Sequence, residues 1–271
     1  MATTASAVRW APATTTHRLD MPTSTGQVDV TVRERDRVQP FLLLHGGAGP
    51  ASVAGFGDLL AARKHARVIM PNHPGFDGTP RPGALASVTG LARLYAALLD
   101  RLDVWDVTVI GNSIGGWIAA ELALLNNPRV SGAILINAVG IEVEGHPVTD
   151  ISRLSPQQVV ALSFHDPGRF APDPGAAGPT PEMIRANMAA LAAYGGGSMT
   201  DPTLLGRLGE LDLPVEVIWG EADRIVTPDY GRAYAKAMPM ARFTLMPGAG
   251  HLPQVEAPEE LLGLIWDLGQ A

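Results

Sequence analysis

The sequence predicts an α/β fold, in which a mostly parallel eight-stranded sheet is flanked by helices and a helical lid is inserted after the sixth strand. The first observation behind this prediction is that short β-branched, apolar runs alternate with helical patterns along most of the chain. The second is that this alternation stops between residues 141 and 208, where proline and glycine are frequent and no strand fits. We therefore expect one core, formed by residues 1–140 and 209–271, and an insertion, residues 141–208, that is not an independent domain.

The expected strands differ in how apolar they are. The run 28–32 (VDVTV) alternates apolar and polar residues, which is typical of a half-exposed edge strand. Later runs are more continuously apolar, as in the middle of a parallel sheet, where helices cover both faces of each strand. These runs are residues 41–44, 68–70, 107–110, 133–136 and 215–219.

Helical spacing of leucine and other apolar residues indicates amphipathic helices between the strands. In the core these patterns cover residues 91–102, 118–125 and 261–268. Two further helical patterns, residues 155–164 and 181–194, lie inside the insertion. Apolar side chains of the insertion, Met188 among them, are expected to form the roof of a substrate pocket.

Composition and charge exclude several classes of function. The chain of 271 residues contains no cysteine, which excludes a disulfide scaffold, a thiolate metal site and a cysteine nucleophile. Its 20 basic residues against 27 acidic ones give a net charge of −7, which argues against binding to nucleic acid. Residues 1–16 lack the apolar stretch of an export signal, and residues 107–125, the longest apolar stretch, are interrupted by polar residues. We expect residues 1–16 to be a loose leader on a cytoplasmic protein that needs no membrane.

The motif most informative about chemistry is GNSIGG at residues 111–116, which directly follows an expected strand and leads into an expected helix. This is the context of the G-x-S-x-G turn, which exposes a serine at the end of a strand. Glycine is needed on either side because larger side chains would collide with the neighbouring helix and strand. The motif predicts that Ser113 is a nucleophile, and the N–H of Ile114 faces any oxyanion formed there.

A serine nucleophile needs a base, and its position favours His251 among the seven histidines. His251 lies in a glycine-rich loop after the run 242–246, where its side chain can reach over the edge of the sheet. A carboxylate must hold that histidine in one tautomer. Asp223 follows the strand 215–219 and is the favoured residue, with Glu221 as its competitor.

The loop HGGAGP at residues 45–50 follows an earlier strand and is expected to complete an oxyanion hole. Its glycines let the backbone approach a substrate closely. We expect the N–H of Gly47 to act with that of Ile114, and Ala48 is the alternative donor.

With these motifs the chain resembles α/β-hydrolase-fold enzymes over residues 28–268, and the order serine, acid, histidine matches that fold. The motifs are HGGAGP (45–50), PNHPGFDG (71–78), GNSIGG (111–116), WGEAD (219–223) and GAGH (248–251). The resemblance implies hydrolysis of an ester or similar carbonyl compound without a cofactor or metal. It also implies that the insertion is a helical lid, and that the partner is a small-molecule substrate of a monomer or homodimer.

Two of these motifs, HGGAGP and GNSIGG, are also similar to those of the meta-cleavage-product hydrolases, which split carbon–carbon bonds in dienoic acids. The resemblance implies that Asn112 faces the substrate, and it aligns Asn187 with the lid arginine that binds the substrate carboxylate in that family. Arg185 lies close by on another helix face, and Leu252 stands where that family more often has tryptophan. We therefore expect an ester hydrolase, with carbon–carbon bond hydrolysis and non-catalytic small-molecule binding as the alternatives.

Overall fold

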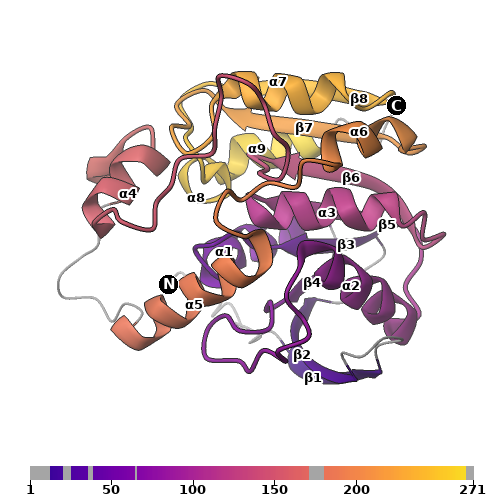
Figure 1. The fold of residues 1–271 in the computed structure, drawn as a ribbon. Coiled ribbons are helices and arrows are strands. Elements are labelled where there is room, and N and C mark those ends of the chain that lie inside the picture. The colour runs from indigo at the N-terminus through magenta and orange to yellow at the C-terminus, as the bar shows by residue number, and fades with distance from the viewer. Residues whose placement is uncertain (1–12, 21–25, 36–38, 65, 171–179, 267–271) are drawn as a thin grey trace, which may run out of the picture.

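A computed structural model describes residues 13–20, 26–35, 39–64, 66–170 and 180–266. It contains one eight-stranded sheet in the order β1-β2-β4-β3-β5-β6-β7-β8 (Figure 1). β1 and β2 pair antiparallel, as do β2 and β4, and every other neighbouring pair is parallel. The strands are β1 (Ala13–Asp20), β2 (Gln27–Arg35), β3 (Gln39–Leu44), β4 (Ala66–Pro71), β5 (Val107–Asn112), β6 (Val130–Ile136), β7 (Val215–Gly220) and β8 (Ala241–Met246). The mostly parallel eight-stranded sheet is thus confirmed.

The N-terminal edge of the sheet differs from the prediction. β2 has the expected alternation, since Val28, Val30 and Val32 are buried between exposed or half-buried residues, but it is not the edge strand. β1 is the edge strand and pairs with the outer side of β2, with Ala13 opposite Glu34 and Asp20 opposite Gln27. The prediction of a loose leader was therefore wrong for residues 13–16, where consecutive threonines favour a strand; residues 1–12 lie outside the described residues.

Helices cover both faces of the sheet (Figure 1). α2, α3 and α7 pack with one hydrophobic cluster, whereas α1 and α9 pack with a second cluster on the opposite face. The helices are α1 (Ala51–Lys64), α2 (Val88–Leu102), α3 (Ile114–Leu124), α4 (Pro156–Ser163), η1 (Pro167–Arg169), α5 (Pro181–Gly195), α6 (Leu204–Arg207), η2 (Leu208–Glu210), α7 (Pro228–Lys236), α8 (Pro253–Glu256) and α9 (Pro258–Trp266). Within the described part of the chain, none of these helices combines the length and the apolar character needed to span a bilayer.

The segment between β6 and β7 carries α4, η1, α5, α6 and η2, and its described residues contain no strand. α4 and α5 each begin with a polar N-cap residue followed by a proline in the first turn. The side chain of Ser155 accepts from the N–H of Gln158, and the side chain of Thr180 accepts from that of Met183. The far end of the segment is fixed to α3, because Arg207 binds the buried Glu121 at 2.6 Å. Figure 1 shows α4 and α5 together at one end of the sheet, beyond the strands.

Candidate active site

Ser113 lies at the tight turn between β5 and α3, as the sequence predicts. Its backbone has φ 58° and ψ −120°, a conformation that a non-glycine residue adopts only where the surroundings enforce it. A Cβ on Gly111 would lie 2.0 Å from the Gly115 carbonyl oxygen, and one on Gly115 would lie 2.4 Å from that of Leu44. Only hydrogen fits at both positions, so the glycines allow α3 to start directly against β3 and β5.

The expected oxyanion donors lie beside this turn. Ile114 is the first residue of α3, so its N–H has no acceptor inside the helix. Among the described residues, no backbone carbonyl accepts from Ile114 or from Gly47. The loop after β3 lies against the serine, because a Cβ on Gly46 would be 3.1 Å from Ser113 Cβ. Ala48, the alternative donor, is the exposed residue of this loop.

His251 and Asp223 form a buried hydrogen-bonded pair. His251 Nδ1 lies 2.8 Å from Asp223 Oδ2. The other carboxylate oxygen, Oδ1, accepts from the N–H groups of Ile225 at 2.8 Å and Val226 at 3.0 Å. This places the proton of a neutral imidazole on Nδ1 and leaves Nε2 as the acceptor. Glu221, the competing acid, is exposed instead.

Sequence reasoning missed Asn137, which completes the environment of Asp223. It follows β6 with φ 47°, is fully buried, and donates its amide Nδ2 to Asp223 Oδ2. Its Oδ1 accepts from the N–H of Gly220 at 3.3 Å. Its only sequence signal was an asparagine directly after a strand, a position that tolerates positive φ.

Asn112, which is expected to face the substrate, has a buried side chain that is hydrogen-bonded within the protein. Its side chain is 1% exposed, and Nδ2 donates to the carbonyl oxygens of Ile136 at 3.3 Å and His251 at 2.9 Å. Its Oδ1 accepts from Gln254 at 3.1 Å. The Asn112 amide therefore joins the end of β5 to the histidine loop. Because Asn112 directly precedes Ser113, this bond holds the backbone of His251 close to the serine turn.

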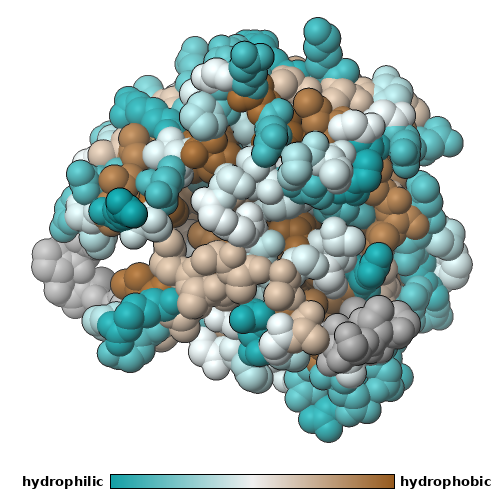
Figure 2. Space-filling model, in the orientation of Figure 1, coloured by the Kyte–Doolittle hydropathy of each residue, from teal (hydrophilic) through white to brown (hydrophobic). Residues whose placement is uncertain are grey.

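On α5, the residues Asn187, Met188 and Leu191 contact the core, whereas Arg185 is exposed. Asn187 and Leu191 lie on the loops after β3 and β4: Asn187 Oδ1 accepts from the N–H of Asp77 at 2.9 Å, and a Cβ on Gly47 would lie 3.0 Å from Leu191 Cδ2. Met188 packs partly buried against the main core cluster. α5 thus lies on the loop that carries the expected oxyanion donor Gly47. Figure 2 shows the weakly hydrophobic outer surface of α5 on the side of the molecule that faces the viewer.

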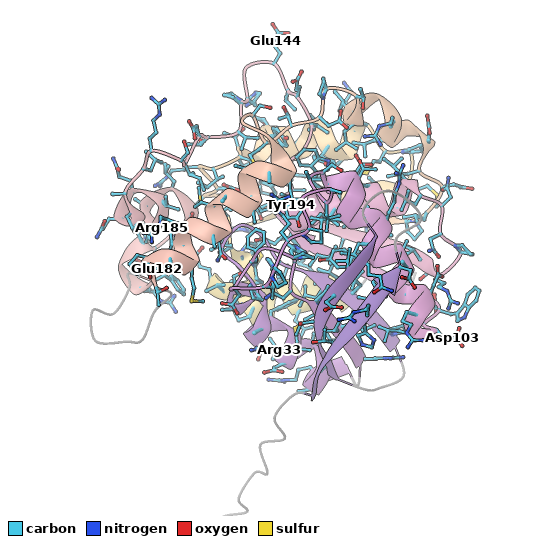
Figure 3. All side chains as sticks on the ribbon, turned by 60° about the horizontal axis from the view of Figure 1, so that its bottom comes forward. Arg33, Asp103, Glu144, Glu182, Arg185 and Tyr194 are labelled. Carbon is cyan, nitrogen blue, oxygen red and sulfur yellow. The ribbon has the colours of Figure 1, made fainter. Side chains whose placement is uncertain are left out.

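Arg185 is not brought to the site. Its side chain is 69% exposed and pairs with Glu182 at 2.9 Å, and Figure 3 shows both at the end of α5 away from Tyr194. Arg169 is exposed too, with its guanidinium 5.5 Å from the ring of Phe170.

Two buried histidines shape the loops beside the site. His45 Nε2 accepts from the N–H of His73 at 3.1 Å, and His73 Nε2 lies 2.9 Å from the carbonyl oxygen of His45. His73 Nδ1 pairs with the hydroxyl of Tyr95. Burial lowers the pKa of His45 to about 4 and lowers that of His73 as well. Both side chains are engaged in hydrogen bonds within these loops and to Tyr95.

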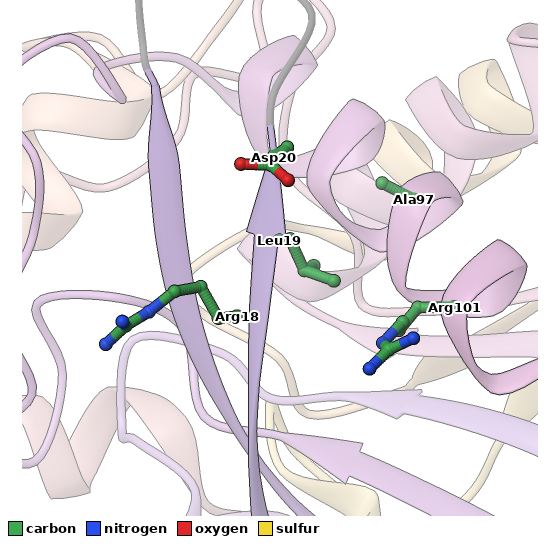
Figure 4. A pocket seen from close by; sticks show the side chains of 5 residues that line it. All are labelled: Arg18, Leu19, Asp20, Ala97 and Arg101. Carbon is green, nitrogen blue, oxygen red and sulfur yellow. The ribbon is translucent and has the colours of Figure 1, made fainter.

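A hollow elsewhere on the molecule lies between β1 and α2 (Figure 4). Arg18, Leu19, Asp20, Ala97 and Arg101 line it. Arg18 is held by Asp29 through two hydrogen bonds at 2.7 and 3.0 Å, and Figure 4 shows it directed away from Arg101. None of these residues contributes to the arrangement around Ser113.

Comparison with known proteins identifies the fold and relatives of similar sequence. Two solved structures share the fold: a thermophilic esterase from Thermogutta terrifontis, with TM-score 0.73, 21% identity and coverage of 94% of this chain and 98% of that one, and the 2-hydroxy-6-oxo-6-phenylhexa-2,4-dienoate hydrolase from Rhodococcus sp. strain RHA1, with TM-score 0.73, 21% identity and coverage of 96% and 100%. In sequence, the chain is 28% identical over 267 residues to 2-hydroxy-6-oxononadienedioate/2-hydroxy-6-oxononatrienedioate hydrolase 1 from Dechloromonas aromatica (strain RCB), covering 89% of this chain and 91% of that protein.

The family comparison covers most of the chain, including every residue of the Ser113 turn and of the loops that hold Asp223 and His251. Residues 41–264 match the alpha/beta hydrolase family. The proteins named above are an esterase and two hydrolases of dienoate or dienedioate compounds. The protein is an enzyme that belongs to the alpha/beta hydrolase family.

Proposed function

We propose that the protein is a serine hydrolase that cleaves neutral ester substrates through an acyl-enzyme. The observation that carries this proposal is the buried His251–Asp223 pair at 2.8 Å beside a serine in a strained turn. A pure binding protein would need neither the fixed histidine tautomer nor a serine held in a strained turn. The pair makes Ser113 a nucleophile because Nε2 accepts the proton that the hydroxyl loses.

The reaction runs in two halves. Ser113 Oγ bonds to the ester carbonyl carbon while His251 Nε2 takes its proton, and the N–H groups of Gly47 and Ile114 stabilise the oxyanion. The C–O bond to the alcohol then breaks, and the alcohol leaves with the proton from His251. Water attacks the acyl-enzyme, giving its proton to His251, and the acid is released as Ser113 recovers its proton.

The charges favour a neutral substrate. An acidic dienoate would need a cation beside Ser113, but Arg185 and Arg169 are exposed and engaged elsewhere. Asn187, at the position aligned with the carboxylate-binding arginine, contacts backbone of the loops below it. The residues 171–179 between η1 and α5 contain no Arg, Lys or His in the sequence.

Carbon–carbon bond hydrolysis is the second candidate. What favours it is the 28% identity to the Dechloromonas aromatica hydrolase over nearly its full length. In either reaction we propose that residues 141–208 act as a helical cover, since Leu191 of α5 lies over Gly47.

The test compares Ser113→Ala with Ser131→Ala on p-nitrophenyl esters and on a dienoic acid substrate. Ser131 is an exposed serine on β6, so its variant should keep full activity. Ester turnover that is lost only in Ser113→Ala supports the proposal. Turnover of the dienoic acid alone would favour the second candidate, and no Ser113-dependent turnover of either would overturn the proposed serine mechanism.

A further inference from the structure

The last carbonyl groups of α4 are bound by the two loops that carry Asp223 and His251. Arg224 donates Nη1 to the carbonyl oxygen of Ala161 at 3.0 Å and its backbone N–H to that of Leu162 at 3.2 Å. The N–H of His251 itself donates to the carbonyl oxygen of Ser163 at 2.6 Å. Carbonyls at a helix end need partners outside the helix. Here those partners place the acid loop and the histidine loop side by side.

Glu256 forms a second link between the same two segments. Its Oε2 accepts from the N–H of Gly250 at 2.7 Å, directly before His251. Its Oε1 accepts from the N–H of Asp166 at 3.0 Å, just after the end of α4. One partly buried carboxylate therefore joins the histidine loop to the inserted segment.

We propose that Glu256 is a positioning residue for His251, which it holds by fastening the end of α4 to the histidine loop. This role rests on the proposed function. The contact leaves little freedom, since a Cβ on Gly250 would lie 2.3 Å from the Ser163 carbonyl oxygen. Without the carboxylate, the two N–H groups lose their charged acceptor and the peptide before His251 is free to shift. A shift of about 1 Å in a catalytic group lowers a rate by about 100-fold.

Glutamine tests the carboxylate with little change in shape. Its amide has one acceptor oxygen, so its NH₂ must face either the N–H of Gly250 or that of Asp166. We expect Glu256→Gln to lower kcat on p-nitrophenyl butyrate about 10- to 100-fold and to change KM less than about threefold, because the substrate contacts stay in place. Labelling of Ser113 by a fluorophosphonate should slow by a similar factor.

The matched control is Glu259→Gln, which removes the same charge from an exposed side chain paired with Arg63 on the surface. It should keep kcat within about twofold, as exposed ion pairs contribute little. Active-site titration by the p-nitrophenol burst, with thermal melting, separates slower turnover from loss of folded protein. Glu256→Ala serves as a second variant that removes both acceptors.

Slow turnover with a full burst amplitude in Glu256→Gln supports the positioning role. A kcat within twofold of the wild type, or a loss of kcat matched by a loss of burst amplitude, would overturn it. If Ser113→Ala is inactive while Glu256→Gln is fully active, the positioning role fails and the proposed function stands. Wild-type turnover that does not depend on Ser113 would overturn both.

Discussion

The Asp223 carboxylate offers the sharpest perturbation, because its two oxygens have different partners. Oδ1 faces the N–H groups of Ile225 and Val226, so the carbonyl oxygen of an asparagine would have to stay there. The NH₂ of Asp223→Asn is then placed at Oδ2, opposite His251 Nδ1 and the amide Nδ2 of Asn137. Asn137 cannot turn its own amide without directing its NH₂ at the Gly220 N–H that it now accepts.

The consequence is a change of tautomer. With an NH₂ donating to it, His251 Nδ1 becomes the acceptor and Nε2 carries the proton, so Nε2 cannot take the serine proton. In the serine-protease triad the same substitution lowers kcat about 10⁴-fold with the geometry intact. At about 1.36 kcal/mol for each factor of ten, this is about 5.4 kcal/mol of transition-state stabilisation. The lost charge-assisted bond and the opposed donors should also lower the free energy of unfolding by about 1–3 kcal/mol.

The assay is kcat on p-nitrophenyl butyrate at neutral pH, with urea unfolding to confirm that the variant is folded. Glu221→Gln is the matched control, because it removes an exposed carboxylate two residues earlier and should leave kcat within about twofold. A folded Asp223→Asn variant with a kcat loss below about 100-fold would refute the reasoning, as would a larger loss in Glu221→Gln.

Three further predictions concern stability. Gly115→Ala should lower the free energy of unfolding by at least about 1–3 kcal/mol in urea titration, because its Cβ would lie 2.4 Å from the Leu44 carbonyl oxygen. Arg207→Ala should cost about 3–5 kcal/mol in the same measurement, since it leaves the 2%-exposed Glu121 carboxylate without its guanidinium. His45 has a folded-state pKa of about 4 against an ordinary 6.5, so as pH falls the unfolded chain binds the proton first. Stability should therefore decline from about pH 6.5 down to about pH 4, by about 3 kcal/mol from this residue.

Each of these predictions has a control. Gly83→Ala adds a Cβ with no atom within 4 Å and should be nearly neutral; equal costs at Gly83 and Gly115 would contradict the steric argument. Arg18→Ala breaks an exposed ion pair with Asp29 and should leave the urea midpoint nearly unchanged. An equal loss of stability in Arg18→Ala and Arg207→Ala would contradict the role of Arg207 as the partner of a buried carboxylate. For His45, a urea midpoint that does not change between pH 6.5 and 4 would be inconsistent with a buried neutral imidazole.

The parts of the site that the sequence predicts are those fixed by local rules. Ser113 is recognisable because a strand, flanking glycines and a helix start lie within a few residues, and His251 lies in a loop whose glycines are visible in the sequence. The hydrogen bonds of Asn112 could not be predicted, because its partners Ile136 and His251 are 24 and 139 residues away in the chain. Such contacts depend on how the strands are ordered, which no local pattern shows.

The same limit applies to the fold. α1 had no predicted helix because glycines interrupt its apolar pattern. The structure explains one of them, since a Cβ on Gly57 would lie 2.2 Å from Met70 Sδ, where the helix packs closely on β4. The bond between Glu256 and Asp166 spans 90 residues and joins a short helix to the inserted segment, so only the assembled structure shows it.

The most direct test of the proposed mechanism is mass spectrometry of the protein after brief reaction with a p-nitrophenyl ester and, separately, with a fluorophosphonate. We predict one p-nitrophenol released in the burst per chain, and an acyl or phosphonyl adduct on the peptide containing Ser113. Neither the burst nor the adduct should form in Ser113→Ala, while Ser131→Ala should give both. An adduct on another residue, or ester turnover with no adduct on Ser113, would contradict a serine-based acyl-enzyme.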